Sequence, residues 1–253
     1  MAMGITGGLF TAMLFCLEVG RRIGVRRMAN TSAETRTGKS VIDAAIFALL
    51  GLLMAFAFSG AATRFDTRRQ HIVTEANAIG TAWLRLDLLA PEAKTELRGL
   101  FRDYLDARLA VYRSLPVVPG ASTEFERSEK LLSQIWQRSV HHIGTEGPTA
   151  TTTLLLGALN EMIDVTTVRF VAMHTHAPTI VFVLLIIMAL ISSLLAGAGM
   201  AGTGRTEWMH MVCFALTLAA TIYLIIDLDA PRQGLIRIDR FDQVLYDLRA
   251  SMK

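Results

Sequence analysis

Two histidine pairs are the first residues whose type and spacing could do chemistry. His141-His142 and His174-Thr175-His176 could offer ring nitrogens to a metal ion. Neither pair has a cysteine or an acidic partner at helical ligand spacing, apart from Glu146 beyond a glycine, and residues i and i+2 point to different faces of a helix. We therefore interpret them as surface or interface histidines. The alternative is a pH-sensing role, because histidine titrates near physiological pH.

A glycine-rich run lies directly after a long apolar segment. Gly197-Ala-Gly199-Met-Ala-Gly202 fits the dinucleotide-binding fingerprint letter by letter. That fingerprint requires a preceding strand, whereas here the preceding segment is long enough to be a membrane helix. We interpret the run as a flexible turn between two helices.

Scattered polar residues raise a second question. Ser59, Thr63, Glu75 and Asn77 lie along one predicted helix, where they either form hydrogen bonds between helices or line a water-filled passage. Their periodicity leaves both interpretations open. Asp227, like Asp43, borders an apolar segment, and we interpret both as residues that cap span ends in contact with water.

Signals for catalysis are weak in this sequence. It contains no nucleophile with a base nearby, no phosphate-binding loop and no paired carboxylates in an apolar setting. We therefore do not expect an enzyme, and we expect no catalytic residue, cofactor or metal site.

Composition places the chain in the membrane. Of its 253 residues, 52% are hydrophobic and 19% are charged, and the mean hydropathy is +0.42. A soluble domain carries about 25% charged residues. The net charge of +3 is too small to indicate nucleic-acid binding, and Cys16 and Cys213 lie in apolar runs that suggest neither a zinc site nor a redox pair. These features predict an integral membrane protein.

Four apolar segments predict four membrane-spanning helices. They are residues 3–17, 44–62, 178–200 and 209–226. The first is short, and a signal peptide is its alternative interpretation, but no basic residue precedes it and no small-residue cleavage site follows it. Four spans place both termini on one side. Basic residues near the span ends number seven on each side, so charge does not decide the orientation.

Residues 63–177 form the long polar region, with thirteen basic and thirteen acidic residues. Its apolar residues recur at helical spacing, and no proline lies between Val41 and Pro91, so the second span is predicted to continue out of the bilayer as one helix. Pro91 then begins a new helix. Further boundaries are predicted at Pro116, at Pro119-Gly120, at a capping box formed by Thr123 and Glu126, and at Pro148.

The predicted fold class is an all-α membrane protein with four transmembrane helices. Its parts are residues 1–62 with spans one and two, 63–177 as a helical extramembrane domain continuous with the second span, 178–228 with spans three and four, and 229–253 as a C-terminal segment.

Several runs in the chain resemble the bestrophin family. Residues 56–68 read FAFSGAATRFDTR, like the second membrane helix of bestrophins, in which an Arg lies eight positions beyond a pore-facing Phe. Residues 159–162 read LNEM, similar to the LNEM run of animal bestrophins that lies shortly before the third span. Residues 227–231 and 234–239 read DLDAP and GLIRID, similar to the acidic, proline-containing stretch just after the fourth bestrophin span. The runs FDTRR at 65–69 and EANAIGTAWLRLDLL at 75–89 are similar to those of bacterial bestrophin-like membrane proteins.

The resemblance implies a symmetric homo-oligomer around an axial pore, which in bestrophins is a pentamer that conducts anions such as chloride. It also implies a bacterial inner-membrane protein, surrounded by lipid, with the helical domain and both termini in the cytoplasm. The family's hydrophobic constriction carries over to Ala48, Leu52 and Phe56, and rings of such side chains can gate by excluding water. The implied cytoplasmic mouth of the pore is formed by Ser59, Thr63 and Arg64.

Two departures from the family pattern have consequences. Bestrophins carry a Trp pair after the shared Arg, where this chain has Phe65-Asp66. The calcium clasp of animal bestrophins needs a dense acidic cluster, and here Asp227, Asp229 and Asp239 remain, so calcium gating is not expected. The leading hypothesis is passive ion conduction, with anions preferred by resemblance. The alternative is a non-conducting membrane scaffold or sensor whose helical domain docks a partner.

Overall fold

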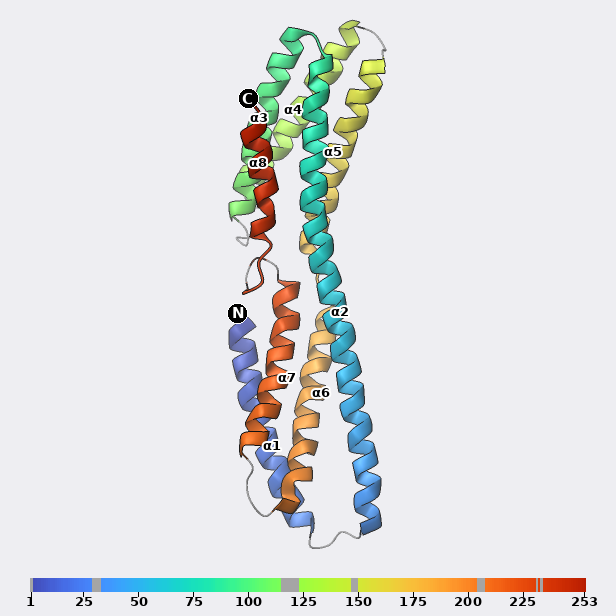
Figure 1. Ribbon diagram of the computed structural model, residues 1–253, viewed down its shortest axis with the longest axis vertical. Coiled ribbons are helices and arrows are strands. Elements are labelled where there is room, and N and C mark those ends of the chain that lie inside the picture. The colour runs from blue at the N-terminus through green and yellow to red at the C-terminus, as the bar shows by residue number, and fades with distance from the viewer. Residues whose placement is uncertain are drawn as a thin grey trace. The chain divides into compact units, whose positions relative to one another are not determined.

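The computed structural model describes residues 2–28, 33–114, 123–146, 150–203, 208–230, 232 and 234–253. Within these ranges it contains eight α-helices, three short 3-10 helices and no strand, which confirms the all-α prediction (Figure 1). The chain divides into two compact units. The apolar unit comprises Met1–Thr63 and His176–Ala230, and the polar unit comprises Arg64–Thr175 and Pro231–Lys253.

The apolar unit contains the four predicted spans. They are α1 (Ala2–Met28), the first part of α2 (Ala33–Arg85), α6 (Thr179–Gly199) and α7 (Trp208–Asp229). All four helices are long and apolar enough to cross a bilayer. Helix α1 packs along α6 and α7, where Met13, Leu17, Leu185, Ala189 and Met211 are buried.

Glycines bring α1 and α6 into very close contact. A β-carbon added at Gly20 would lie 2.0 Å from the carbonyl oxygen of Leu194, and one added at Gly197 would lie 2.0 Å from that of Leu17. Small residues at such an interface let two helix backbones approach each other. The interpretation of residues 197–202 as a flexible turn is therefore wrong for Gly197 and Gly199, which lie inside α6. The turn begins only at the 3-10 helix η2 (Met200–Thr203).

Helix α2 is continuous over 53 residues, as the proline-free sequence predicts. It is followed by the 3-10 helix η1 (Leu86–Leu88), and α3 (Pro91–Ser114) begins at Pro91. Proline suits the first position of a helix, because the N–H that it lacks would have no partner there.

The polar unit is built from the rest of α2 together with α3, α4 (Thr123–Glu146), α5 (Ala150–His174), η3 (Asp239–Asp242) and α8 (Gln243–Ser251). Its core is apolar and contains Ile72, Ile79, Leu86, Leu97, Phe101, Leu105, Ile135, Leu155, Leu159, Met162 and Leu245. Each such side chain stabilises the fold by about 1.5–3 kcal/mol when it is fully buried. The predicted boundaries at Pro116, Pro119-Gly120 and Pro148 lie outside the described residues.

Arg68 joins α2 to the end of α5 in this unit. Its guanidinium donates hydrogen bonds to the carbonyl oxygens of Ala172 at 3.0 Å and Thr175 at 2.6 Å. The last carbonyl groups of a helix have no partner within the helix, so a buried arginine at this position satisfies them.

Candidate functional site

The predicted constriction residues share one exposed face of α2. Ala48, Leu52 and Phe56 follow one another at intervals of four, which turns successive side chains by about 40°. Leu52 is 52% exposed, Phe56 is 66% exposed and Ala48 is also exposed. Leu50 and Met54, on the opposite face, are buried. The structure therefore brings the three residues together on a surface that the chain itself leaves uncovered.

Helix α2 is the least covered of the four apolar helices. In its most apolar window 11% of the residues are buried inside the chain, compared with 28% for α1 and 39% for α7. One contact of α2 with α7 is an edge-on ring pair, Phe47 and Phe214, whose centroids lie 6.3 Å apart. An uncovered face on a membrane helix must meet lipid, water or another protein chain.

The predicted mouth residues lie on two faces of α2. Ser59 and Thr63 are exposed and continue the face of the constriction residues, and the Thr63 hydroxyl donates to the carbonyl oxygen of Ser59 at 2.9 Å. Arg64 is rotated by about 100° from Thr63 and is half-buried. Its charge therefore flanks the exposed face instead of extending it.

Glu75 and Asn77, which the sequence placed on the same helix, have different environments. Asn77 is exposed, whereas Glu75 is fully buried in the polar unit. The Glu75 carboxylate accepts hydrogen bonds from Arg108 Nε at 2.8 Å and from the Tyr112 hydroxyl at 2.8 Å, and it also pairs with Arg169. For Glu75, the interpretation as a residue that bonds between helices is therefore correct.

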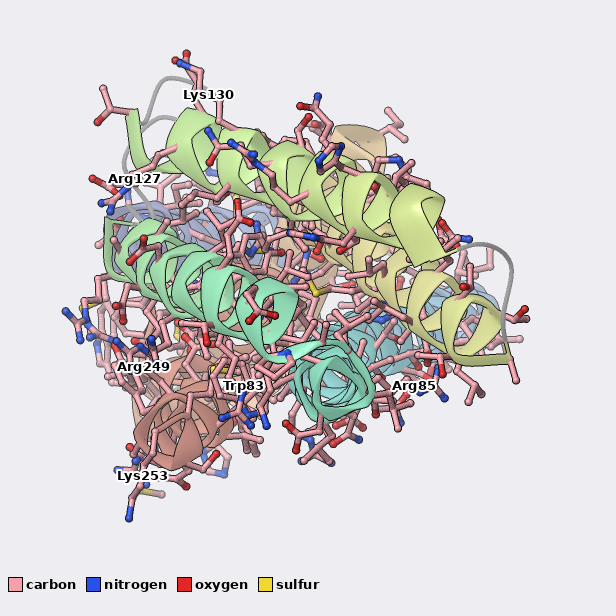
Figure 2. The ribbon with its side chains drawn as sticks, turned by 90° about the horizontal axis from the view of Figure 1, so that it is seen from above. Trp83, Arg85, Arg127, Lys130, Arg249 and Lys253 are labelled. Carbon is pink, nitrogen blue, oxygen red and sulfur yellow. The ribbon has the colours of Figure 1, made fainter. Side chains whose placement is uncertain are left out.

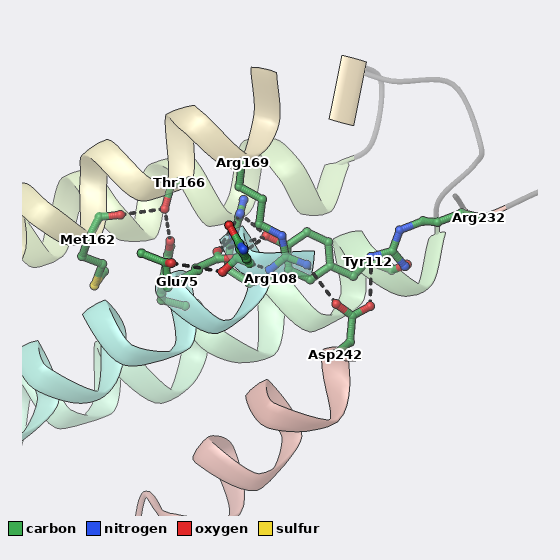
Figure 3. A network of polar contacts seen from close by, with 11 residues as sticks. Glu75, Arg108, Tyr112, Met162, Thr166, Arg169, Arg232 and Asp242 are labelled. Atoms are coloured by element: carbon green, nitrogen blue, oxygen red, sulfur yellow. Dashed lines mark hydrogen bonds and ion pairs between the residues drawn. The ribbon is translucent and has the colours of Figure 1, made fainter. Parts of the chain in front are cut away.

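A second carboxylate extends these contacts to the C-terminal part of the chain. Arg169 Nη2 lies 2.9 Å from Asp242 Oδ1, and Arg232 Nη2 lies 2.9 Å from Asp242 Oδ2 (Figure 3). The Tyr112 ring lies among the guanidinium groups, with the Cζ atom of Arg169 3.6 Å from its centroid and that of Arg232 at 5.6 Å. We call the set formed by Glu75, Arg108, Tyr112, Arg169, Arg232 and Asp242 the buried charge network.

Charge pairing fixes the ionisation of this network, which lies beyond the membrane-spanning part of α2. Burial by itself would raise the pKa of the Glu75 carboxyl, but the charges of Arg108 and Arg169 outweigh burial and hold that pKa below its ordinary value. Burial also raises the pKa of the Tyr112 hydroxyl, and it raises the pKa of Tyr104 to about 12. At neutral pH Glu75 is therefore ionised and Tyr112 is neutral.

The histidines that the sequence singled out are distributed over separate contacts. His142 Nε2 lies 2.9 Å from Glu96 Oε2, and Arg138 Nε lies 3.2 Å from the other oxygen of that carboxylate. His176 Nδ1 lies 3.1 Å from the carbonyl oxygen of Asp229. In the part of the chain that the structure describes, no group of three or more His, Cys, Asp or Glu side chains is arranged to hold a metal ion.

The end of α7 differs from the sequence expectation. Asp227 and Asp229 are both buried. The Asp229 carboxylate accepts a hydrogen bond from the backbone N–H of Ala177 at 3.2 Å and lies 3.4 Å from His176 Nδ1. The expectation that Asp227 is in contact with water was therefore wrong, and the contacts of Asp229 show that the segment before α6 covers this end of α7.

Five basic side chains of the polar unit lie at separate places on it. Figure 2 shows Arg127 and Lys130 on α4, well separated from Arg249 and Lys253 at the C-terminal end. Arg85, at the end of α2, lies apart from both pairs.

Comparison with known proteins agrees with this architecture. Two variants of a bacterial bestrophin homolog from Klebsiella pneumoniae superpose on the chain with TM-scores of 0.68 and 0.67, at 15% and 14% identity. Each alignment covers 96% of this chain, and they cover 98% and 97% of the Klebsiella chains. A further solved structure, described as a membrane protein, has a TM-score of 0.62 at 17% identity and covers 94% of this chain and 97% of its own.

At these identities the solved structures establish the fold. No curated protein matches the chain. The family is established independently by a family model, the Bestrophin-like domain, which matches residues 8–241. The helical architecture, the four apolar helices and this match lead to one conclusion: the chain is a membrane protein that belongs to the bestrophin-like family.

Proposed function

We propose that this protein assembles as a symmetric homo-oligomer, a pentamer by analogy with bestrophins, and conducts ions passively along its central axis. The assembly would lie in the bacterial inner membrane, with the polar unit and both termini in the cytoplasm. Helix α2 would line the pore, with a constriction formed by Ala48, Leu52 and Phe56 and a mouth formed by Ser59, Thr63 and Arg64.

The uncovered face of α2 is the observation that supports this proposal most directly. Copies of this face arranged around an axis would form apolar rings of Leu52 and Phe56, followed by rings of Ser59 and Thr63 hydroxyls. Apolar rings hold back water and ions, and hydroxyl groups can replace part of an ion's hydration shell. Gly51 is also exposed, with nothing within 4 Å of an added β-carbon. Small residues favour close packing of helices from neighbouring subunits.

The choice of ion is the second part of the proposal. Bestrophins, which the chain resembles, conduct anions, and a ring of Arg64 side chains beside the mouth would raise the local concentration of anions. A preference for chloride over potassium is therefore expected, and the ratio of the two effluxes measures it.

Flux through the purified oligomer in liposomes tests the proposal. Vesicles loaded with potassium chloride are diluted into low salt, and chloride and potassium efflux are followed separately. We expect chloride efflux from vesicles that contain the protein. Absence of flux for chloride, fluoride, potassium and sodium, with a correctly assembled oligomer, would overturn the proposal and favour a non-conducting scaffold or sensor.

A matched pair of variants locates the pore. Phe56→Ala removes the larger constriction ring and should raise the flux by about tenfold, which corresponds to a barrier lower by about 1.4 kcal/mol. Phe15→Ala makes the same change on α1, where the side chain is 70% exposed, and should leave the flux within about twofold of the wild type. Equal effects of the two variants would exclude Phe56 from the conduction path.

A further inference from the structure

The last residues of the chain are built into the core of the polar unit. We call Arg232 and residues 234–253 the C-terminal segment. Its side chains Ile238, Leu245 and Met252 are buried together with residues of α2, α3 and α5. At the surface, Arg249 pairs with Asp106 through two hydrogen bonds of 2.8 and 2.9 Å.

The C-terminal segment approaches α2 at three levels. The Arg69 guanidinium on α2 lies 5.1 Å from the centre of the Phe241 ring. Gly80 faces Leu248, so a β-carbon added to the glycine would lie 3.4 Å from Leu248 Cδ1. Between these two levels, Arg169 of α5 bridges the Glu75 carboxylate of α2 and the Asp242 carboxylate of the segment.

The middle contact gives the buried pair Arg108 and Arg169 a second carboxylate. Arg108 and Arg169 are buried between α2, α3 and α5, where Glu75 is the carboxylate that both contact. Asp242 supplies the second negative charge for this pair, and it reaches the site from the C-terminal segment. When the segment is not docked, Asp242 leaves together with Arg232, and Arg108 and Arg169 share the single carboxylate of Glu75, which destabilises the surrounding helices.

We propose that the C-terminal segment is a clasp that holds residues 69–80 of α2 in place, and that undocking of the segment loosens this part of α2. The clasp is a local folding unit with a docked and an undocked state. Residues 69–80 of α2 are more stable when the segment is docked than when it is undocked. Its consequence for conduction rests on the proposed function, because α2 is then the pore-lining helix. The coupling between the segment and α2 does not require conduction.

Hydrogen–deuterium exchange on the full-length oligomer tests the clasp. Asp242→Asn removes the charge that pairs with Arg169 and Arg232. We expect amides in 234–253 and in 68–85 to exchange at least about tenfold faster, with residues 44–62 unchanged. Asp247→Asn is the matched control, because Asp247 is exposed and accepts a hydrogen bond from Gln243 of the same helix at 2.8 Å. It should leave all three regions unchanged.

Two results would overturn the proposal. Faster exchange in 234–253 with unchanged exchange in 68–85 would show that the segment undocks without affecting α2. Unchanged exchange in both regions would show that Asp242 does not hold the segment. If Asp242→Asn does not give a folded oligomer, Asp106→Asn removes the exposed pair with Arg249 and should speed exchange in 234–253 and in 68–85 together, by about two- to fivefold. Faster exchange in 234–253 alone, or unchanged exchange in both regions, would again contradict the clasp.

Flux measured in parallel separates this inference from the proposed function. If the wild-type protein conducts chloride in liposomes, the chloride fluxes of the Asp242→Asn and Asp247→Asn variants should differ by at least about twofold. A wild-type protein that conducts no ion would defeat the proposed function, and the exchange data would still decide whether the clasp exists.

Discussion

Replacing Glu75 by glutamine would leave two buried guanidinium groups without the carboxylate that they share. The side chains of Glu75, Arg108 and Arg169 are at most 2% exposed, so solvent cannot screen the loss. Glutamine keeps the shape of the side chain but brings an amide group toward donors on Arg108 and Arg169. The perturbation therefore tests charge pairing with little change in volume.

The expected magnitude follows from the contacts that survive. Removal of one partner from a buried ion pair costs about 3–5 kcal/mol. Arg169 keeps its contact with Asp242, and Arg108 keeps its contact with the Tyr112 hydroxyl. The lower end of the range, about 3 kcal/mol, is therefore expected, and for a chain of this size it corresponds to a fall in Tm of about 6–12 °C.

Thermal unfolding of the purified protein in detergent, followed by circular dichroism, measures this effect. Glu161→Gln provides the matched control, because Glu161 is an exposed residue on α5, and a surface change of this kind shifts stability by about 0.5 kcal/mol or less. A Tm for Glu75→Gln as high as that for Glu161→Gln would refute the conclusion that paired charge stabilises the polar unit.

Two further predictions concern pH and helix packing. The Glu75 pKa is lowered in the folded protein from an ordinary value of 4.5, so its contribution to stability is complete above about pH 4.5 and is lost as the pH falls through the lowered pKa. The Tm of the wild type should therefore fall more steeply on acidification than that of Glu75→Gln, and parallel pH profiles of the two proteins would contradict this. Gly20→Ala should destabilise the apolar unit by about 1–3 kcal/mol, because its β-carbon would overlap the Leu194 carbonyl. Gly8→Ala is the control on the same helix, where an added β-carbon has nothing within 4 Å, and comparison of the two Tm values in detergent checks the prediction. Equal Tm values would show that α1 and α6 can move apart to accommodate the added β-carbon without a loss of stability.

Local sequence signals were sufficient to predict the helices. Three signals depend on neighbouring residues alone: the apolar segments of membrane-spanning length, the absence of proline before Pro91, and the proline at the start of α3. The structure confirms the helices that they predict. The shared face of Ala48, Leu52 and Phe56 follows from their spacing in the same way. Whether this face lines a pore depends on other copies of the chain and stays a prediction.

Contacts between distant residues could not be predicted from local patterns. Glu75 pairs with Arg108 and Arg169, which lie 33 and 94 positions away in the sequence. In the sequence it is one polar residue among several on a long helix, and nothing nearby distinguishes it from the exposed Asn77. Gly197 was misinterpreted for the same reason, because the backbone that it touches, at Leu17, belongs to the first helix of the chain.

The glycine contact between α1 and α6 has a consequence for biosynthesis. The ribosome makes α1 first, and the segment that covers Gly20 follows only after roughly 170 further residues, which takes about ten to thirty seconds at common translation rates. During that interval the glycine face of α1 lacks the helix that it contacts in the folded chain, so lipid or the insertion machinery must cover it. The nascent protein therefore passes through a stage in which α1 is inserted but not yet packed against α6.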